Sequence, residues 1–161
     1  MRRVRRLNAG LSSRWCEPKA TEEQYALFSR YVTERHAGGD MSEMTWEEYR
    51  AMIEDAPVRT GVVEWRDASG VLRAALLTDR LRDGISAVYS FFDPDDSARS
   101  PGTFIVLDIL AGCRARGVAY LYLGIGCTRV VRCRTKQDFN PWRRSAQPAG
   151  PPSYCRRRRH E

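Results

Sequence analysis

Residues 85–124 read ISAVYSFFDPDDSARSPGTFIVLDILAGCRARGVAYLYLG, and this stretch decides the fold. Its first part, Ile85 to Phe92, predicts a strand with aromatic groups on both faces. Ser100-Pro101 joins a typical cap residue to the residue favoured at the first helical position, which predicts a helix as far as about Arg116. Val118 to Gly124 is then a second strand. A strand, a helix and a strand in this order usually form a right-handed crossover between parallel neighbours.

Strict alternation along the first of these strands sorts its side chains onto two faces of the sheet. One face carries Ile85, Ala87, Tyr89 and Phe91, and the other carries Ser86, Val88, Ser90 and Phe92. We therefore expect Tyr89 and Phe91 to share one face and Phe92 to lie opposite them.

The residues before this stretch predict two helices and a β-hairpin. Thr21 with Gln24 and Thr45 with Glu48 have capping-box spacing, so helices are expected over 20–36 and from 45 to about 57. Strand signals over 62–65 and 71–78 flank a turn, as in a hairpin. The resulting order α-α-β-β-β-α-β indicates an α+β fold with a mixed sheet, two parallel strands around one helix and two N-terminal helices, which is the core plan of GNAT-like acyltransferases. A fold of this kind does not by itself reveal a function.

Charge is distributed unevenly along the 161 residues. The net charge is +5 over residues 1–19, −6 over 20–124 and +8 over 125–161. We interpret 20–124 as the folded domain, 1–19 as a basic N-terminal segment, and 125–161, rich in proline, arginine and cysteine, as a disordered tail. Such basic ends fit a polyanionic partner or are simply solvated termini.

Composition excludes several classes of protein. No apolar run approaches the roughly 20 residues of a membrane span, so a cytoplasmic location is expected. The five cysteines include no Cys-x-x-Cys pair, and we therefore expect reduced thiols and no zinc site.

Several longer stretches resemble one known family. They are RLNAGL (6–11), ATEEQYALFSRY (20–31), RHAGGDM (35–41), LTDRLRDGISAVYSFFDP (77–94) and YLYLG (120–124). They are similar to the C-terminal domain of aminoacyl-tRNA–protein transferases, a family of arginyltransferases and bacterial aspartate/glutamate leucyltransferases. The resemblance covers about residues 2–124.

The resemblance implies a transfer reaction. The α-amine of a protein beginning with Asp or Glu attacks the ester that joins leucine or arginine to the 3′ end of tRNA, and the new peptide bond marks the acceptor for degradation in the N-degron pathway. Because the ester is already activated, no metal or other cofactor is expected. The expected partners are aminoacyl-tRNA and the acceptor protein. Leucine and arginine both remain open as the amino acid transferred.

The chain departs from the family at both ends. Family members carry an additional N-terminal domain, so residues 1–19 are expected to be the remnant of its connection. After Gly124 only Lys136, Phe139 and Pro141 echo the family pattern, and we hypothesise a shifted reading frame there.

Within this resemblance, the candidate site residues fall into two groups. The candidates for proton transfer and for binding the amine are His36, Asp79, Asp83, Tyr89 and Asp93. The candidates for substrate binding are Tyr31, Arg35, Phe92, Ser100, Gly102, Tyr120 and Tyr122.

Each candidate role has a structural alternative. Arg35 would pair with an acidic side chain or a phosphate, and the carboxylates would orient the incoming ammonium group. Exposed rings would stack on the terminal adenine, and the segment around Ser100 and Gly102 would hold a phosphate. The alternatives are helix-end cations, solvated turn carboxylates, core aromatic residues and an ordinary helix cap.

Two other functions compete with the transferase. One is an acyl-CoA N-acyltransferase of the same fold. Pro101, which lacks an amide donor, and the bulky Phe104 argue against a CoA pocket. The other is an inactive truncated fragment that binds RNA weakly.

Overall fold

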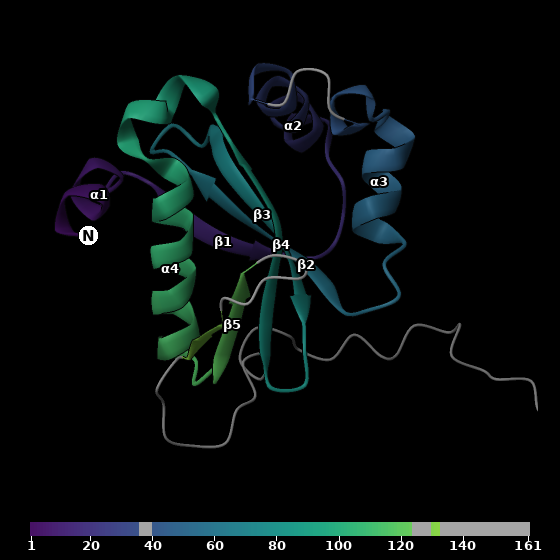
Figure 1. Ribbon diagram of the computed structural model, residues 1–161. Helices are drawn as coiled ribbons and strands as arrows, with labels where there is room; N and C mark the ends of the chain where they lie inside the picture. Colours follow the sequence, from purple (N-terminus) through teal and green to yellow (C-terminus); the bar gives the residue numbers. More distant parts are fainter. Residues whose placement is uncertain (36–39, 124–129, 133–161) are drawn as a thin grey trace, which may run out of the picture.

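A computed structural model describes residues 1–35, 40–123 and the backbone of 130–132. In this part of the chain, six strands form one sheet in the order β1-β2-β3-β4-β5-β6. Helices α1 and α4 cover one face of the sheet, and α2 and α3 cover the other (Figure 1). The strands are β1 (Ser12–Cys16), β2 (Thr60–Arg66), β3 (Leu72–Arg80), β4 (Gly84–Phe92), β5 (Tyr120–Leu123) and β6 (Val130–Arg132). The α-helices are α1 (Arg2–Leu7), α2 (Glu22–Arg35), α3 (Trp46–Glu54) and α4 (Pro101–Ala115), with short 3₁₀ helices η1 (Asp40–Glu43) and η2 (Pro94–Arg99).

The topology of the sheet confirms the predicted fold class. Strands β1 to β4 pair antiparallel, β4 and β5 are parallel with α4 between them, and β6 pairs antiparallel with β5. The strand–helix–strand unit therefore forms where residues 85–124 predict it. Among the described residues, no helix has the length and apolar character needed to cross a bilayer.

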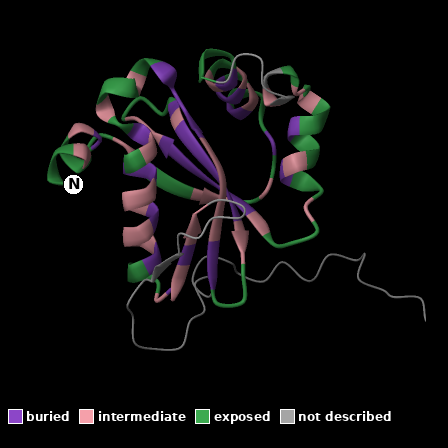
Figure 2. Ribbon diagram, viewed as in Figure 1, coloured by how far each residue is buried: buried purple, intermediate pink, exposed green. Residues whose placement is uncertain are grey.

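The sheet separates two hydrophobic cores. On the α4 side, Trp65, Ile85 and Ile105 are almost fully buried. On the α2 and α3 side, Phe28, Tyr49 and Phe91 pack together. The buried residues form the layers between the sheet and its helices, with exposed positions on the outer helix surfaces (Figure 2).

The predicted starts of α2 and α3 are confirmed in detail. Thr45 Oγ1 accepts from the amide of Glu48, and the Glu48 carboxylate accepts from the amide of Thr45, which is a complete capping box. Thr21 and Gln24 exchange the equivalent pair of bonds before α2.

Two elements that the sequence analysis did not anticipate precede α2. Residues 1–19 contain α1 and β1. Asn8, 1% exposed, holds this segment in place because its side-chain amide donates to the carbonyl of Arg99 at 2.9 Å. The short strand Ser-Ser-Arg-Trp-Cys lacks the alternation that reveals a strand in a sequence. Strand β6 was also not anticipated, and the rest of the predicted tail lies outside the described residues.

The predicted alternation of β4 is wrong in one respect. Tyr89 pairs with Leu77 and Ala87 pairs with Thr78, so Val88 is an extra residue that forms a bulge. The bulge reverses the side-chain order, because Ala87 packs toward the α4 core whereas Tyr89 packs toward the α2 core. Tyr89 and Phe91 do share a face, as expected, with Phe92 on the other.

Candidate active site

The two parallel strands separate beyond their first residues. Strand β4 pairs with β5 from Gly84 to Ala87, and Val88–Phe92 have no strand partner on that side within the described residues. Gly84 permits the close approach at the start of the pair, because a Cβ atom there would collide with the carbonyl oxygen of Tyr120. The bulge at Val88 lies at the point of separation, and bulges are frequent beside active sites.

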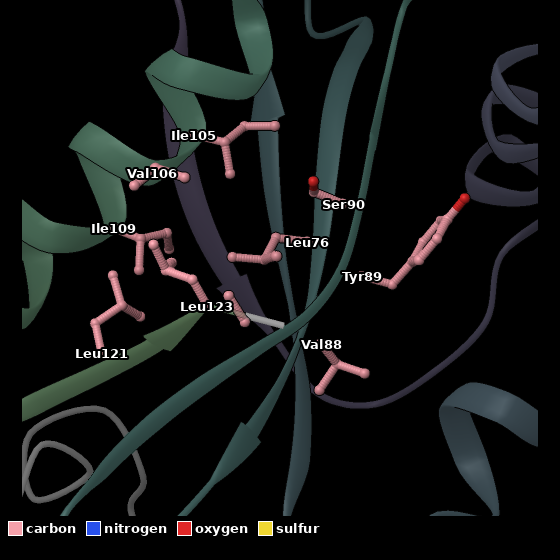
Figure 3. Close-up of a pocket in the computed structure, with 10 residues that line it drawn as sticks. Leu76, Val88, Tyr89, Ser90, Ile105, Val106, Ile109, Leu121 and Leu123 are labelled. Atoms are coloured by element: carbon pink, nitrogen blue, oxygen red, sulfur yellow. The ribbon is translucent and has the colours of Figure 1, made fainter. Parts of the chain in front are cut away.

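A cavity of about 310 Å³ lies where the strands separate. Helix α4 contributes Ile105, Val106 and Ile109, and β5 contributes Leu121 and Leu123 (Figure 3). The remaining lining residues are Leu76, Ala87, Val88, Tyr89 and Ser90. No charged side chain belongs to this described lining, so the cavity suits an apolar group of moderate size.

Tyr89 follows the bulge directly. Its ring points away from Leu76 and Ile105, toward α2, where it packs against Phe28 with ring centroids 5.9 Å apart (Figure 3). Burial, with a smaller effect of Tyr31, raises the pKa of the Tyr89 hydroxyl above its usual value. The hydroxyl is therefore protonated at neutral pH and suited to donate a hydrogen bond.

Four predicted site residues, Tyr31, Arg35, Phe92 and Gly102, meet at the C-terminal end of β4. The ring of Tyr31 packs against Phe92 with centroids 4.8 Å apart, and the guanidinium of Arg35 lies 5.2 Å above the Phe92 ring. A Cβ atom on Gly102 would lie 3.4 Å from the same ring, so α2, β4 and α4 converge here. Phe92 is 6% exposed, and its ring is therefore not available for stacking on a base, contrary to expectation. His36 lies outside the described residues.

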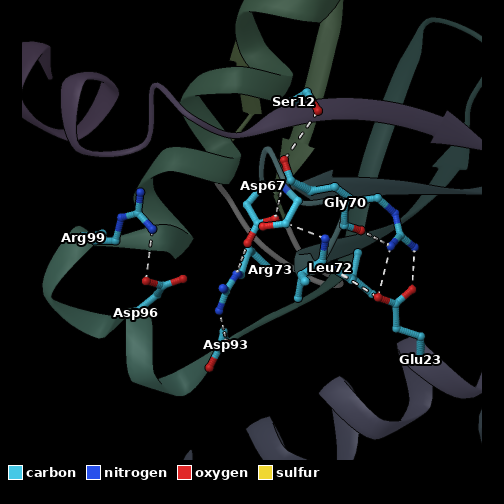
Figure 4. A network of polar contacts seen from close by, with 12 residues as sticks. Ser12, Glu23, Asp67, Gly70, Leu72, Arg73, Asp93, Asp96 and Arg99 are labelled. Atoms are coloured by element: carbon cyan, nitrogen blue, oxygen red, sulfur yellow. Dashed lines mark hydrogen bonds and ion pairs between the residues drawn. The ribbon is translucent and has the colours of Figure 1, made fainter.

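Asp93 is not a free carboxylate. It is 5% exposed, and both oxygens are occupied: Oδ1 accepts from Arg30 and from the amide of Asp95, and Oδ2 accepts from Arg73. Figure 4 shows the contact with Arg73, which also binds Asp67. These contacts contradict the expected role of binding an ammonium group, because both oxygens already have partners. The sequence did not reveal the two arginines that surround Asp93.

Ser100 was predicted to cap α4, and the structure contradicts a cap made by its side chain. Its backbone is left-handed, with φ 53° and ψ 55°, and its hydroxyl makes no capping bond. The chain turns sharply at Ser100 from η2 into α4, which positions Gly102 beside Phe92. Pro101 lacks an amide hydrogen, so the first turn of this helix offers fewer donors to a phosphate.

The remaining candidates lie at the opposite end of β4. Tyr122 donates to Asp83 at 2.9 Å, and this hydrogen bond is the main reason that the pKa of Tyr122 is raised. The Tyr120 and Tyr122 rings lie side by side with centroids 6.1 Å apart. Asp79 accepts from Thr60 at 2.8 Å and lines a second cavity of about 420 Å³.

These two ends cannot serve one reacting atom. Gly84 and Phe92 are eight residues apart on one strand, which corresponds to about 26 Å. The structure therefore brings together Tyr31, Arg35, Phe92 and Gly102, but separates Asp79 and Asp83 from Asp93. The cavity itself could not be predicted from the sequence, because Ile105, Val106 and Ile109 have the spacing of ordinary core residues. Within the described residues, no group of His, Cys, Asp and Glu side chains could hold a metal ion.

Comparison with known proteins connects this geometry to a family. The profile described as "Arginine-tRNA-protein transferase, C terminus" matches residues 23–145. The aspartate/glutamate leucyltransferase of Granulibacter bethesdensis is 46% identical over 140 residues, which are 87% of this chain and 52% of that protein. The protein of the same name from Paramagnetospirillum magneticum is 45% identical over 154 residues, or 91% of this chain and 63% of that protein. The chain thus spans between half and two thirds of the length of these relatives.

Two solved structures were also matched. The ribosomal-protein-S18-alanine N-acetyltransferase of Escherichia coli has a TM-score of 0.48 at 19% identity, covering 70% of this chain and 66% of that chain. A putative acyl-CoA N-acyltransferase of Klebsiella pneumoniae has a TM-score of 0.48 at 16% identity, covering 72% of each chain. The family assignment rests on the sequence matches, which extend over more than half of the chain. By this match, the chain belongs to the family of arginine-tRNA-protein transferase C-terminal domains.

Proposed function

We propose that this chain is the catalytic domain of an aminoacyl-tRNA–protein transferase. It transfers leucine from leucyl-tRNA to the α-amine of cytoplasmic proteins that begin with Asp or Glu, and thereby marks them for degradation in the N-degron pathway. The names of the curated relatives support this acceptor and this donor.

The apolar lining of the cavity is the observation that favours leucine over arginine as the amino acid transferred. A leucyl side chain in this cavity gains roughly 1.5–3 kcal/mol from burial. An arginyl side chain would bury a guanidinium without a carboxylate among the described lining residues, at a cost of several kcal/mol. The cavity therefore favours leucine, although the description of the matching family profile names arginine.

The reaction needs positioning and a hydrogen-bond donor more than a strong base. The acceptor nitrogen forms a bond to the ester carbon, the ester carbon–oxygen bond breaks, and the ribose oxygen leaves with a proton. An α-amine has an ordinary pKa of about 7.7–8.0, so a useful fraction is already neutral near pH 7. We assign the Tyr89 hydroxyl, which lies on the α2 side from which the acceptor would approach, as the donor to the oxygen that gains negative charge.

The acceptor would approach from the side of α2. Arg35 is exposed beside Tyr31 and Phe92, and its guanidinium suits the carboxylate of an N-terminal Asp or Glu. His36, the next residue along the chain, stays a candidate for accepting the amine proton. Asp79, Asp83, Tyr120 and Tyr122 stay candidates only for contacts remote from this centre.

A transfer assay tests the proposal. The chain is incubated with tRNA charged with radiolabelled leucine or arginine and with peptides beginning with Asp, Glu or Ala. We expect label in the Asp and Glu peptides from leucyl-tRNA, and little from arginyl-tRNA. Acetyl transfer from acetyl-CoA in place of aminoacyl transfer would instead support the acyl-CoA alternative. Because the relatives are longer, the assay includes a version fused to the N-terminal domain of a relative.

A further inference from the structure

The described arginines differ in their partners: four pair with carboxylates, and several exposed arginines in different parts of the fold do not. Arg30, Arg66, Arg73 and Arg99 each form an ion pair with a carboxylate. In contrast, Arg2, Arg3, Arg5, Arg6 and Arg114 are exposed and form no ion pair within the described residues. We call these five the α1 arginine surface. Their charge is therefore available to an external anion.

These five arginines belong to two helices that pack together. Helix α1 lies along the outer flank of α4, and the Arg5 guanidinium donates to the carbonyl of Leu107 at 3.4 Å (Figure 1). Arg114 follows Leu107 by seven residues, nearly two helical turns, so it lies on the same flank of α4 about 10 Å further along. The surface thus extends along α4.

The surface is held rigidly beside the corner that leads to the candidate site. Arg99 Nε donates to the carbonyl of Leu7 at 2.9 Å, and Asn8 donates back to the carbonyl of Arg99 at 2.9 Å. Arg99 immediately precedes Ser100, where the chain enters α4, and Gly102 contacts Phe92. A ligand that spans α1 therefore lies next to the first turn of α4.

The chemistry of the surface favours a nucleic-acid backbone. Arginine forks match phosphate oxygens, and rows of arginines bind nucleic acids through their phosphates. A membrane surface is less suitable, because Val4 is partly buried against the protein core, which leaves Met1 at the start of α1 as the one strongly exposed apolar side chain of this described segment. The apolar residue at the end of the helix, Leu7, is also only partly exposed.

From these observations we propose that the α1 arginine surface binds the phosphate backbone of the acceptor stem of the donor tRNA, an inference that rests on the proposed function. The stem contacts protein through charge and without reading sequence. Its single-stranded 3′ end is left to enter the cavity between β4 and β5.

The test compares two triple variants that each remove three positive charges. Arg2→Gln, Arg3→Gln and Arg6→Gln alter the proposed surface and retain Arg5, whose bond to Leu107 helps to dock α1. Arg14→Gln, Arg50→Gln and Arg82→Gln are the matched control, because these residues are exposed on β1, on α3 and after β3. Binding of uncharged fluorescent tRNA to the full chain is measured by anisotropy at several salt concentrations, with circular dichroism to verify folding.

We expect the α1 variant to bind tRNA at least tenfold more weakly at 100 mM salt. For this variant, the slope of log affinity against log salt concentration should become shallower by roughly 2–3. The slope of the control variant should change little. Equal weakening in both variants, or an unchanged α1 variant, would overturn the inference. Binding to vesicles containing phosphatidylserine is measured in parallel. If the α1 variant loses binding to these vesicles but not to tRNA, the inference is overturned and the surface binds a membrane.

The binding result is independent of the transfer result. If wild-type chain binds tRNA through α1 but transfers no amino acid, the surface stands and the proposed reaction fails. If the chain transfers leucine and the α1 variant has an unchanged KM for leucyl-tRNA, the reaction stands and the surface fails.

Discussion

Asp93 Oδ2 accepts a hydrogen bond from Nη1 of Arg73 at 3.0 Å, joining the end of β4 to the beginning of β3. The other carboxylate oxygen accepts from Arg30 on α2 at 3.2 Å. Asp93 therefore connects three elements immediately after Phe92, and its role in the fold explains its burial. The carboxylate holds the end of β4 in position for Tyr31 and Arg35.

Replacing this carboxylate should reduce stability. Asp93→Asn is expected to lower the free energy of unfolding by about 1–3 kcal/mol, because the buried acceptor of two arginines loses its charge. The loss stays in this range because both guanidinium groups remain partly exposed to water. Urea denaturation measures the change. The matched variant is Asp95→Asn, since the Asp95 side chain is 81% exposed and should cost under about 1 kcal/mol. An Asp93→Asn protein of wild-type stability but without transfer activity would restore a direct role in binding the amine.

The contact between Gly84 and Tyr120 gives a second prediction. Gly84→Ala should destabilise the protein by about 1–3 kcal/mol, since the new methyl group meets main-chain atoms that cannot move aside. We also expect weaker transfer, because the cavity lies where β4 and β5 diverge from this contact. Thermal unfolding and the transfer assay measure the two effects. Gly10→Ala is the control, with nothing within 4 Å of its added Cβ, and a similar loss there would contradict this explanation.

The sequence predicted elements whose signals are local. Capping boxes at Thr21 and Thr45 marked two helices correctly, and Pro101 marked the start of α4. The strand–helix–strand order was sufficient to infer the parallel pair. These features depend on residues within a few positions of one another.

The site was predicted less completely because it depends on contacts between distant residues. Nothing near Asp93 in the sequence indicates that Arg30 and Arg73 surround it, 63 and 20 residues away. The bulge at Val88 inserts one residue into β4, and its position depends on the pairing with β3. Alternation alone therefore misplaced Tyr89 relative to Ala87.

A third prediction concerns the unpaired hydroxyl of Tyr49. This side chain is fully buried, its oxygen has no hydrogen-bond partner within the described residues, and burial together with Glu64 raises its pKa. Tyr49→Phe should therefore leave the unfolding free energy at pH 7 unchanged or slightly higher, since no bond is lost.

The same residue links stability to alkaline pH. In the unfolded chain Tyr49 ionises near pH 10, whereas the folded state keeps the proton, so the folded state binds more protons above that pH. The stability that this group contributes is fully present below pH 10 and declines as the pH rises above it. Tyr49→Phe should make this decline shallower in urea titrations between pH 9 and 11. An identical slope in both proteins would contradict the prediction.

Tyr89 gives a prediction about rate. Tyr89→Phe should lower kcat by roughly 100–1000-fold, the range for a lost donor to a developing oxyanion, with little change in KM for leucyl-tRNA. Because the pKa of Tyr89 is raised, the wild-type rate should show no loss from ionisation of this group below pH 10. Single-turnover transfer measures both. The ring contact with Phe28 remains in the variant, so unfolding would not explain the loss. A variant with wild-type kcat would remove Tyr89 from the reaction.

The last prediction tests how the cavity selects its amino acid. Val106 lines the cavity from α4 and is only partly buried, so a longer polar side chain can be accommodated there. Val106→Glu places a carboxylate where an arginyl guanidinium would otherwise be unpaired, whereas Val106→Gln adds nearly the same volume without charge. We expect both variants to transfer leucine at least tenfold more slowly, and only Val106→Glu to raise the ratio of arginine to leucine transferred. Competition between the two charged tRNAs measures that ratio. If Val106→Gln changes it equally, volume and not charge determines the selection, and the argument from the missing carboxylate is wrong.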